Sequence, residues 1–181
     1  MTKRLFHFSN DPKIESFEPR SVRVSSTRPE GMEWLNGPLV WAIDDAHSPL
    51  YLFPRECPRI IMWRTNETSC EEAAKFLEPS TSMTAYVEKA WEIRIEEAVL
   101  FRYELPTKHF ISLDDVGMHV ARTRVRPLSC AQVSDLPNQL AGAGVALRTL
   151  NSLTPLRDAW SSSLHVSGIR LRNAVGWAEE R

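Results

Sequence analysis

Two polar side chains near the start of the chain could bind a ligand together. His7 and Ser9 stand two residues apart, and the stretch Arg4–Phe8 has the apolar pattern that predicts a first β-strand. Because alternate side chains of a strand share a face, both polar groups would point the same way and form a small hydrogen-bonding platform. A histidine among aromatic residues is, however, more often a core residue whose hydrogen bonds are satisfied within the protein. The two alternatives stay open.

A second pair, His47 and Tyr51, follows the short apolar run Leu39–Ile43, which predicts a buried strand. Asp44 or Asp45 could accept hydrogen bonds from the first N–H groups of a helical turn over 45–53. In such a helix His47 and Tyr51, four residues apart, would lie on one face. A chance placement on one helix face explains the pair about as well as a ligand site does.

Arginine outnumbers lysine by 17 to 5, although the formal net charge is only −1. The guanidinium fork suits bidentate contacts with carboxylate or phosphate. Alternating arginines share one face of a strand, and two predicted strands carry them: Arg122 and Arg124 on 118–125, with Arg126 directly after it, and Arg170 and Arg172 on 168–172. Two such ribbons would make a cationic shelf for phosphate or a nucleic-acid backbone. The same charges could equally keep an exposed sheet edge soluble.

The three cysteines, Cys57, Cys70 and Cys130, share no metal-ligand spacing. We therefore expect no metal site, no disulfide and a reduced, cytoplasmic compartment. Arg55 and Arg59 on either side of Cys57 could lower the pKa of its thiol, but the neighbouring prolines and apolar strands favour an inert, packed cysteine. The sequence also lacks a glycine-rich phosphate loop, a nucleophile elbow and a zinc-binding histidine pair.

The composition, 43% hydrophobic and 25% charged, is that of one globular domain over 1–181, and no apolar run approaches the length of a membrane span. The predicted elements are short and irregularly spaced, which favours an α/β protein of the α+β type with a mixed, mostly antiparallel sheet. The predicted strands are 4–8, 39–43, 58–63, 99–105, 118–125, 128–133, 145–150 and 168–172. The other predicted helical segments are 10–17, 70–78, 83–96, 135–142 and 154–164.

Four stretches spread over nearly the whole chain resemble an uncharacterised bacterial family of unknown function. They are LFHFSNDPKIESFEPR (5–20), WLNGPLVWAIDDAHSPLYLFPRECPRI (34–60), YELP (103–106) and LHVSGIRLRNA (164–174). That family brings no established activity with it.

The order of these signals is also similar to the ADP-ribosyltransferase superfamily, which includes bacterial toxins, poly(ADP-ribose) polymerases and RNA 2′-phosphotransferases. This resemblance implies NAD as the ligand or substrate. It implies that His7 and Ser9 form the platform on the first strand. It also implies an aromatic side chain that stacks on nicotinamide, which is Tyr51 by motif order, with Trp41 as the substitute.

The third strand of that superfamily is often led by a catalytic glutamate, and it corresponds to 118–127 here. Met118 and His119 occupy the place of the glutamate. A carboxylate at this place would stabilise the oxocarbenium character that develops when the nicotinamide–ribose bond breaks, so its absence leaves catalysis open. The resemblance then implies either a nucleotide-binding domain without the reaction or a variant that uses His119 as the catalytic residue. In the variant, Arg122 and Arg124 would form charge-assisted hydrogen bonds with a phosphate group of the substrate.

The leading expectation is an ADP-ribosyltransferase-like domain that binds NAD or a related nucleotide-phosphate ligand. The alternative is a non-enzymatic module that binds RNA or an acidic protein through its arginine-rich strands. Clustering of His7, Ser9, Tyr51 and His119 in one cleft would favour the first, and arginines spread over a flat face would favour the second.

Overall fold

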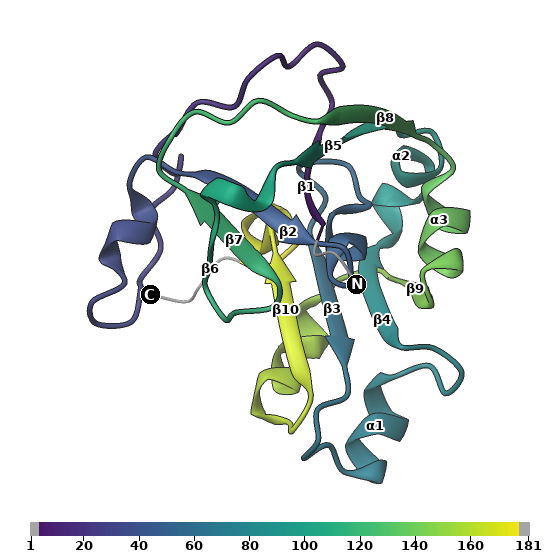
Figure 1. Cartoon of the computed structure of the whole chain (residues 1–181). Helices are drawn as coiled ribbons and strands as arrows, with labels where there is room; N and C mark the ends of the chain where they lie inside the picture. Colours follow the sequence, from purple (N-terminus) through teal and green to yellow (C-terminus); the bar gives the residue numbers. More distant parts are fainter. Residues whose placement is uncertain (1–3, 178–181) are drawn as a thin grey trace. The chain divides into compact units, whose positions relative to one another are not determined.

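The structure, a computed structural model, describes residues 4–177. In this range the chain forms ten β-strands in two sheets, three short α-helices and several 3₁₀ helices (Figure 1). The chain divides into two compact units, one made of the chain up to Ser48 with Leu100–Val133, the other of Pro49–Val99 with the chain from Ser134. The predicted α+β class with mostly antiparallel strands is confirmed. The expectation of one domain over 1–181 stays a prediction.

The sheet of the first unit has six strands in the order β6-β7-β2-β1-β5-β8, and every neighbouring pair is antiparallel. Its strands are β1 (Leu5–Ser9), β2 (Val40–Asp44), β5 (Leu100–Leu105), β6 (Ile111–Ser112), β7 (Met118–Ala121) and β8 (Ser129–Val133). The strands predicted over 4–8, 39–43, 99–105 and 128–133 are confirmed to within one residue at each end.

Both faces of this sheet carry apolar clusters. Ala121 of β7 belongs to a buried cluster with Phe17 and Tyr103. The preceding residue, Val120, belongs to a different cluster with Leu39. Because neighbouring residues of a strand point to opposite faces, the two clusters lie on opposite sides of the sheet. The face of Ala121 is also the face of His7, Ser9 and His119.

The loop after β1 is held by side chains rather than by helical hydrogen bonds. Asp11 Oδ1 accepts from the main-chain N of Lys13 at 2.8 Å. The Tyr103 hydroxyl donates to the main-chain O of Asp11 at 2.6 Å and accepts from the main-chain N of Ile14 at 3.1 Å. The helical turn predicted over 10–17 is therefore wrong, because these side chains take up the backbone groups that a helix would pair.

The sheet of the second unit has four strands in the order β10-β3-β4-β9, antiparallel except for the parallel pair β4 and β9. Its strands are β3 (Arg59–Trp63), β4 (Met83–Glu88), β9 (Val145–Leu150) and β10 (His165–Ile169), and its helices are α1 (Cys70–Phe76), α2 (Glu92–Glu96) and α3 (Leu136–Gly142). The predicted elements 58–63, 70–78, 135–142 and 145–150 are confirmed. Figure 1 shows β4 between β3 and β9.

Two predicted elements of the second unit are wrong in type or extent. The helix predicted over 83–96 is strand β4 followed by a 3₁₀ turn and α2. The strand predicted over 168–172 ends at Ile169, because Arg170 has φ +57° and a left-handed backbone cannot continue a strand. The predicted helix 154–164 is the 3₁₀ helix Thr154–Ser161.

The core of the second unit lies between β3 and this 3₁₀ helix. Ile60 and Met62 of β3 are fully buried and pack in one cluster with Leu156 and Ala159. Within residues 4–177, no helix is long and apolar enough to cross a lipid bilayer.

Candidate functional site

His7 joins the first two strands of the first unit. Its Nδ1 lies 2.9 Å from the main-chain O of Trp41. A carbonyl can only accept, so Nδ1–H is the donor. The ring also packs against Phe17, with 4.7 Å between the ring centroids. His7 therefore has a structural role in linking β1 to β2, beside any contact with a ligand.

Ser9 is buried, and its hydroxyl takes part in the turn that follows β1. Ser9 Oγ accepts a hydrogen bond from the main-chain N of Asp11 at 3.1 Å. The predicted arrangement of His7 and Ser9 on one face of β1 is present, and both side chains support the loop that covers this face.

His119 is the most unusual polar residue of the first unit. Its side chain is only 4% exposed. Nδ1 donates to the main-chain O of Gly117 at 2.8 Å, which leaves Nε2 as the acceptor of the neutral ring. Among the residues that the structure describes, Nε2 is the one buried side-chain nitrogen or oxygen atom without a hydrogen-bond partner. Such a group carries a desolvation penalty of about 1–3 kcal/mol, and such groups occur at functional sites.

The register of the sheet brings His7 and His119 to the same face. Ala42 of β2 lies opposite His119 of β7, and continuing the β1–β2 register places Ala42 opposite His7. Trp41 is the neighbour of Ala42 in the chain, so it points to the other face. There it packs against the cluster of Leu35, Leu39 and Val120. Trp41 cannot share a ligand with the two histidines on one face.

A carboxylate–imidazole pair lies close to His119. Asp44 Oδ1 accepts from the main-chain N of His47 at 2.9 Å and from its Nδ1 at 2.8 Å. The main-chain O of Gly117 accepts from both the main-chain N of Asp44 and Nδ1 of His119. Asp44 and Gly117 thus connect the two imidazoles. The capping role of Asp44 was predicted from the sequence, but its connection with His119 was not.

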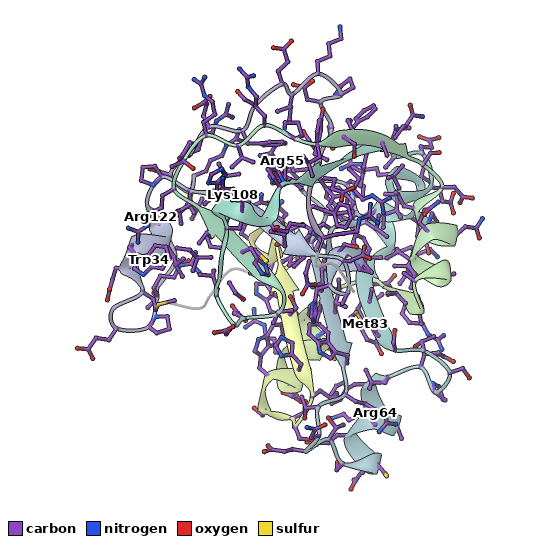
Figure 2. All side chains as sticks on the ribbon, in the orientation of Figure 1. Trp34, Arg55, Arg64, Met83, Lys108 and Arg122 are labelled. Atoms are coloured by element: carbon purple, nitrogen blue, oxygen red, sulfur yellow. The ribbon has the colours of Figure 1, made fainter. Side chains whose placement is uncertain are left out.

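The arginine ribbon predicted on 118–125 is wrong. Strand β7 ends at Ala121, because the chain bends after it and Val125 forms an isolated bridge with Phe17. Arg122 stacks over the ring of Trp34, with 4.7 Å between the guanidinium carbon and the ring centroid (Figure 2).

The other arginines of that stretch do not form a ribbon either. Arg124 forms an ion pair with Glu18, so its charge is already compensated. Arg126 also follows the end of β7 and does not lie in a strand. This stretch therefore forms no continuous cationic face on a strand.

Tyr51 belongs to the second unit, at the end of the 3₁₀ helix Ser48–Tyr51. His47 precedes this helix, so the predicted helical face with His47 and Tyr51 is absent. The half-buried ring of Tyr51 lies beside Arg59, with 5.7 Å between its centroid and the guanidinium carbon. The ring of Phe53 lies 5.0 Å from the same carbon.

Arg59 is a buried cation. Its side chain is 2% exposed, Nε donates to the main-chain O of Leu50 and Nη1 to that of Cys57, both at 2.9 Å. No carboxylate of the described residues forms an ion pair with it. Burial lowers the pKa of Arg59 to about 10, so the side chain stays charged at neutral pH.

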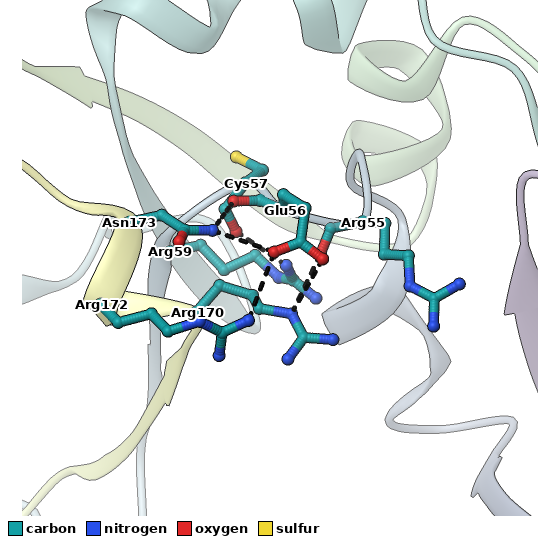
Figure 3. A network of polar contacts seen from close by, with 7 residues as sticks. All are labelled: Arg55, Glu56, Cys57, Arg59, Arg170, Arg172 and Asn173. Carbon is teal, nitrogen blue, oxygen red and sulfur yellow. Dashed lines mark hydrogen bonds and ion pairs between the residues drawn. The ribbon is translucent and has the colours of Figure 1, made fainter. Parts of the chain in front are cut away.

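Arg59 is part of a larger group, which we term the arginine cluster: Arg55, Glu56, Arg59, Arg170, Arg172 and Asn173 (Figure 3). Glu56 Oε2 accepts from Asn173 Nδ2 at 3.1 Å and from Arg172 Nη2 at 3.3 Å. Its other oxygen, Oε1, lies 3.9 Å from Nε of Arg170. A single carboxylate is thus surrounded by donors from one short segment.

The backbone of the loop 55–57 is tied to the same segment. Asn173 Nδ2 also donates to the main-chain O of Glu56 at 2.7 Å, and Arg170 Nε donates to that of Arg55 at 3.3 Å. The hydrogen bond from Asn173 is the main cause that lowers the pKa of Glu56. Partial burial opposes this effect, and the charges of Arg170, Arg172 and Arg55 reinforce it.

All three cysteines are free in this structure. Cys57 is fully buried, whereas Cys70 and Cys130 are exposed. Burial raises the pKa of the Cys57 thiol to about 12, against the smaller opposite effect of Arg59. Cys57 is therefore an inert, packed thiol. In the part of the chain that the structure describes, no group of three or more His, Cys, Asp or Glu side chains could hold a metal ion.

Replacing His119 by leucine is expected to raise the free energy of unfolding by about 1 kcal/mol, because it removes a buried acceptor that has no partner among residues 4–177. The main-chain O of Gly117 keeps its hydrogen bond from Asp44. Urea unfolding followed by circular dichroism measures the change. His109→Leu, at an exposed histidine of the same unit, is the control and should change stability by less than about 0.5 kcal/mol. A loss of stability in His119→Leu would show that Nε2 is hydrogen-bonded in solution.

Comparison with known proteins places this arrangement in a family. The sequence matches the family described as a family of unknown function (DUF6886) over residues 6–174. No curated protein and no solved structure matches the chain. The match includes all four stretches named in the sequence analysis, except for residue 5. As those stretches predicted, the chain belongs to a family of unknown function, DUF6886.

Proposed function

We propose that this protein binds a small phosphate-bearing ligand of the nucleotide class, with NAD as the leading candidate, at the arginine cluster of its second unit. The observation that carries this proposal is an excess of positive charge. The described residues of the cluster include four guanidinium groups but only one carboxylate, Glu56, which leaves an excess of three positive charges. Even when the buried Glu88, whose charge acts on Cys57, is counted as well, an excess of two remains.

Phosphate suits this cluster better than other anions of similar size. Its oxygens can accept from several guanidinium N–H groups at once, and each charge-assisted hydrogen bond contributes about 1.5–3 kcal/mol. The side chains of Arg170 and Arg172 are 34% and 47% exposed, so an incoming ligand can reach them. Arg59 adds a fixed, buried charge whose position is set by two main-chain carbonyls.

Tyr51 supports the choice of a nucleotide over inorganic phosphate alone. Its ring lies beside the guanidinium of Arg59. Stacking of a base or a nicotinamide ring on an aromatic side chain contributes about 1–3 kcal/mol per base. A dinucleotide such as NAD carries both the phosphates for the arginines and an aromatic ring for Tyr51.

In this proposal the protein resembles ADP-ribosyltransferases in its ligand, NAD, and not in the reaction that those enzymes catalyse. We expect binding without measurable release of nicotinamide, since in the resemblance Met118 and His119, which carry no carboxylate, take the sequence position of the catalytic glutamate. The alternative, binding of RNA or an acidic protein by arginine ribbons, has lost its geometric support. Neither Arg122–Arg126 nor Arg170–Arg172 lies in a regular strand.

We also propose a cytoplasmic location for the protein. Two observations support this location: the three cysteines are free, and two of them are exposed. Exposed free thiols persist in a reducing compartment.

Isothermal titration calorimetry with NAD, ADP and inorganic phosphate tests the proposal, with adenosine as the phosphate-free control. NAD and ADP should bind, and adenosine should not. Arg172→Gln should weaken binding about 10- to 100-fold, which corresponds to the loss of one charge-assisted hydrogen bond. Arg94→Gln, which removes the same charge from the exposed surface of α2, is the matched control and should bind as the unmodified protein does. Equal affinity for NAD in the two variants would rule out the arginine cluster as the site.

A further inference from the structure

The carboxylate of Glu56 occupies the place in the arginine cluster where a ligand phosphate would bind. Its donors are Arg172 and Asn173 at 3.3 and 3.1 Å, with Arg170 at 3.9 Å. Figure 3 shows these side chains converging on the one carboxyl group. Carboxylate and phosphate accept from the same guanidinium and amide donors, so the two anions compete for one set of partners.

The contacts of this carboxylate are of the kind that a ligand can replace. The side chain of Glu56 is 47% exposed, and no guanidinium of the described residues holds it by two short parallel hydrogen bonds. Exposed ion pairs with single, long contacts contribute little to stability.

The loop itself does not depend on the carboxylate. Its main chain is fixed separately by Asn173 on the carbonyl of Glu56 and by Arg170 on the carbonyl of Arg55. The carboxylate can therefore leave while the loop keeps its place.

We propose that Glu56 is a built-in competitor that a ligand must displace, and that it keeps weakly binding monoanions out of the site. This inference rests on the proposed function, since it concerns the same cluster. A terminal phosphate or a pyrophosphate bridge, each with about two negative charges, gains more from the excess positive charge than a carboxylate with one. An incoming monoanion gains nothing over Glu56, which is already tethered at the site.

This competition has a consequence for the Glu56→Gln variant. The amide keeps the shape of the side chain and one acceptor oxygen, but it removes the competing charge. Affinity for inorganic phosphate should rise about tenfold, because the ligand no longer has to displace a charged group from the same donors. Affinity for acetate should rise by a similar factor, so acetate binding should become detectable in the variant.

Titration calorimetry with inorganic phosphate and with acetate tests the inference on the full chain. Glu67→Gln is the matched control, since it removes the same charge from an exposed position of the same unit. Glu56→Ala is the second variant, in case Glu56→Gln folds poorly, and circular dichroism checks the fold of each protein. The expected result is tighter phosphate binding and detectable acetate binding in the Glu56 variants alone.

Two results would overturn the inference, and they differ in what they say of the site. If the unmodified protein, Glu56→Gln and Glu67→Gln bind phosphate equally well, Glu56 is not a competitor, although the arginine cluster still binds phosphate. If none of the proteins binds phosphate, ADP or NAD, the proposed function itself fails and takes the inference with it.

Discussion

Replacing Arg59 by alanine is expected to lower the free energy of unfolding by about 3–5 kcal/mol, a large share of the stability of an ordinary domain. Its guanidinium group is the donor for the main-chain O of Leu50 and of Cys57, both at 2.9 Å. Both of these residues are buried, so water cannot easily replace the lost donors. The truncation also leaves a cavity beside the ring of Phe53.

Two further substitutions separate the causes of this loss. Arg59→Met fills most of the volume but removes the donors, and it should cost less than Arg59→Ala. Arg94→Ala, at an exposed arginine of α2, should change stability by less than about 0.5 kcal/mol. Urea unfolding monitored by circular dichroism and tryptophan fluorescence measures all three. A gain in stability in Arg59→Met would mean that the cost of burying the charge outweighs its hydrogen bonds, contrary to this prediction.

Replacing Gly117 by alanine is expected to cost about 2–4 kcal/mol, because two unfavourable effects add. Gly117 has φ +69°, a left-handed conformation that disfavours any side chain. A Cβ atom at this position would also lie 2.5 Å from Asp44 Oδ1 and 2.5 Å from His47 Nδ1. The side chain would therefore force apart the carboxylate–imidazole pair and shift the carbonyl that accepts from His119.

Two other glycines provide matched controls for this variant. Gly31 has φ +80°, but no heavy atom lies within 4 Å of the position that a Cβ atom would take, so Gly31→Ala should cost only the backbone part, about 1 kcal/mol. Gly142 lies in α3 with open space around it, so Gly142→Ala should be neutral or stabilising by up to about 1 kcal/mol. The difference between Gly117→Ala and Gly31→Ala isolates the clash. If the two variants lose the same stability, the Asp44–His47 pair moves without cost.

The sequence predicted those strands and helices that are marked by a signal between residues close together in the chain. Alternation of apolar and polar residues identified β5, which is Leu100–Leu105. Helix α1 begins where Ser69 Oγ accepts from the main-chain N of Glu72, an interaction between residues three apart. Such signals depend on neighbours in the chain, so they survive without knowledge of the fold.

The stretch 83–96 shows why a local pattern can mislead. Met83, Tyr86, Val87, Ala90 and Trp91 have helical spacing, which predicted one long helix. Strand β4 forms instead, because it is paired on both edges, by β3 and by β9. Ala85 and Val87 are fully buried there. Pairing with strands distant in sequence therefore outweighed the helical spacing. Tyr86 and Val87 also suit a strand, because aromatic and β-branched residues are frequent in strands.

By itself the sequence determined the α+β class, most of the short strands, and the placement of His7 and Ser9 on one face. It could not identify the arginine cluster, because Glu56 and Arg172 are separated by 116 residues and no local spacing joins them. It also could not show that β7 ends before Arg122, since that end depends on the pairing of Val125 with Phe17. Nε2 of His119 has no hydrogen-bond partner in the described part of the chain, and this likewise follows from burial by segments distant in sequence. Contacts between distant segments decide which charged side chains are compensated and which polar atoms are buried. The arginine cluster and His119 are recognised by these two properties.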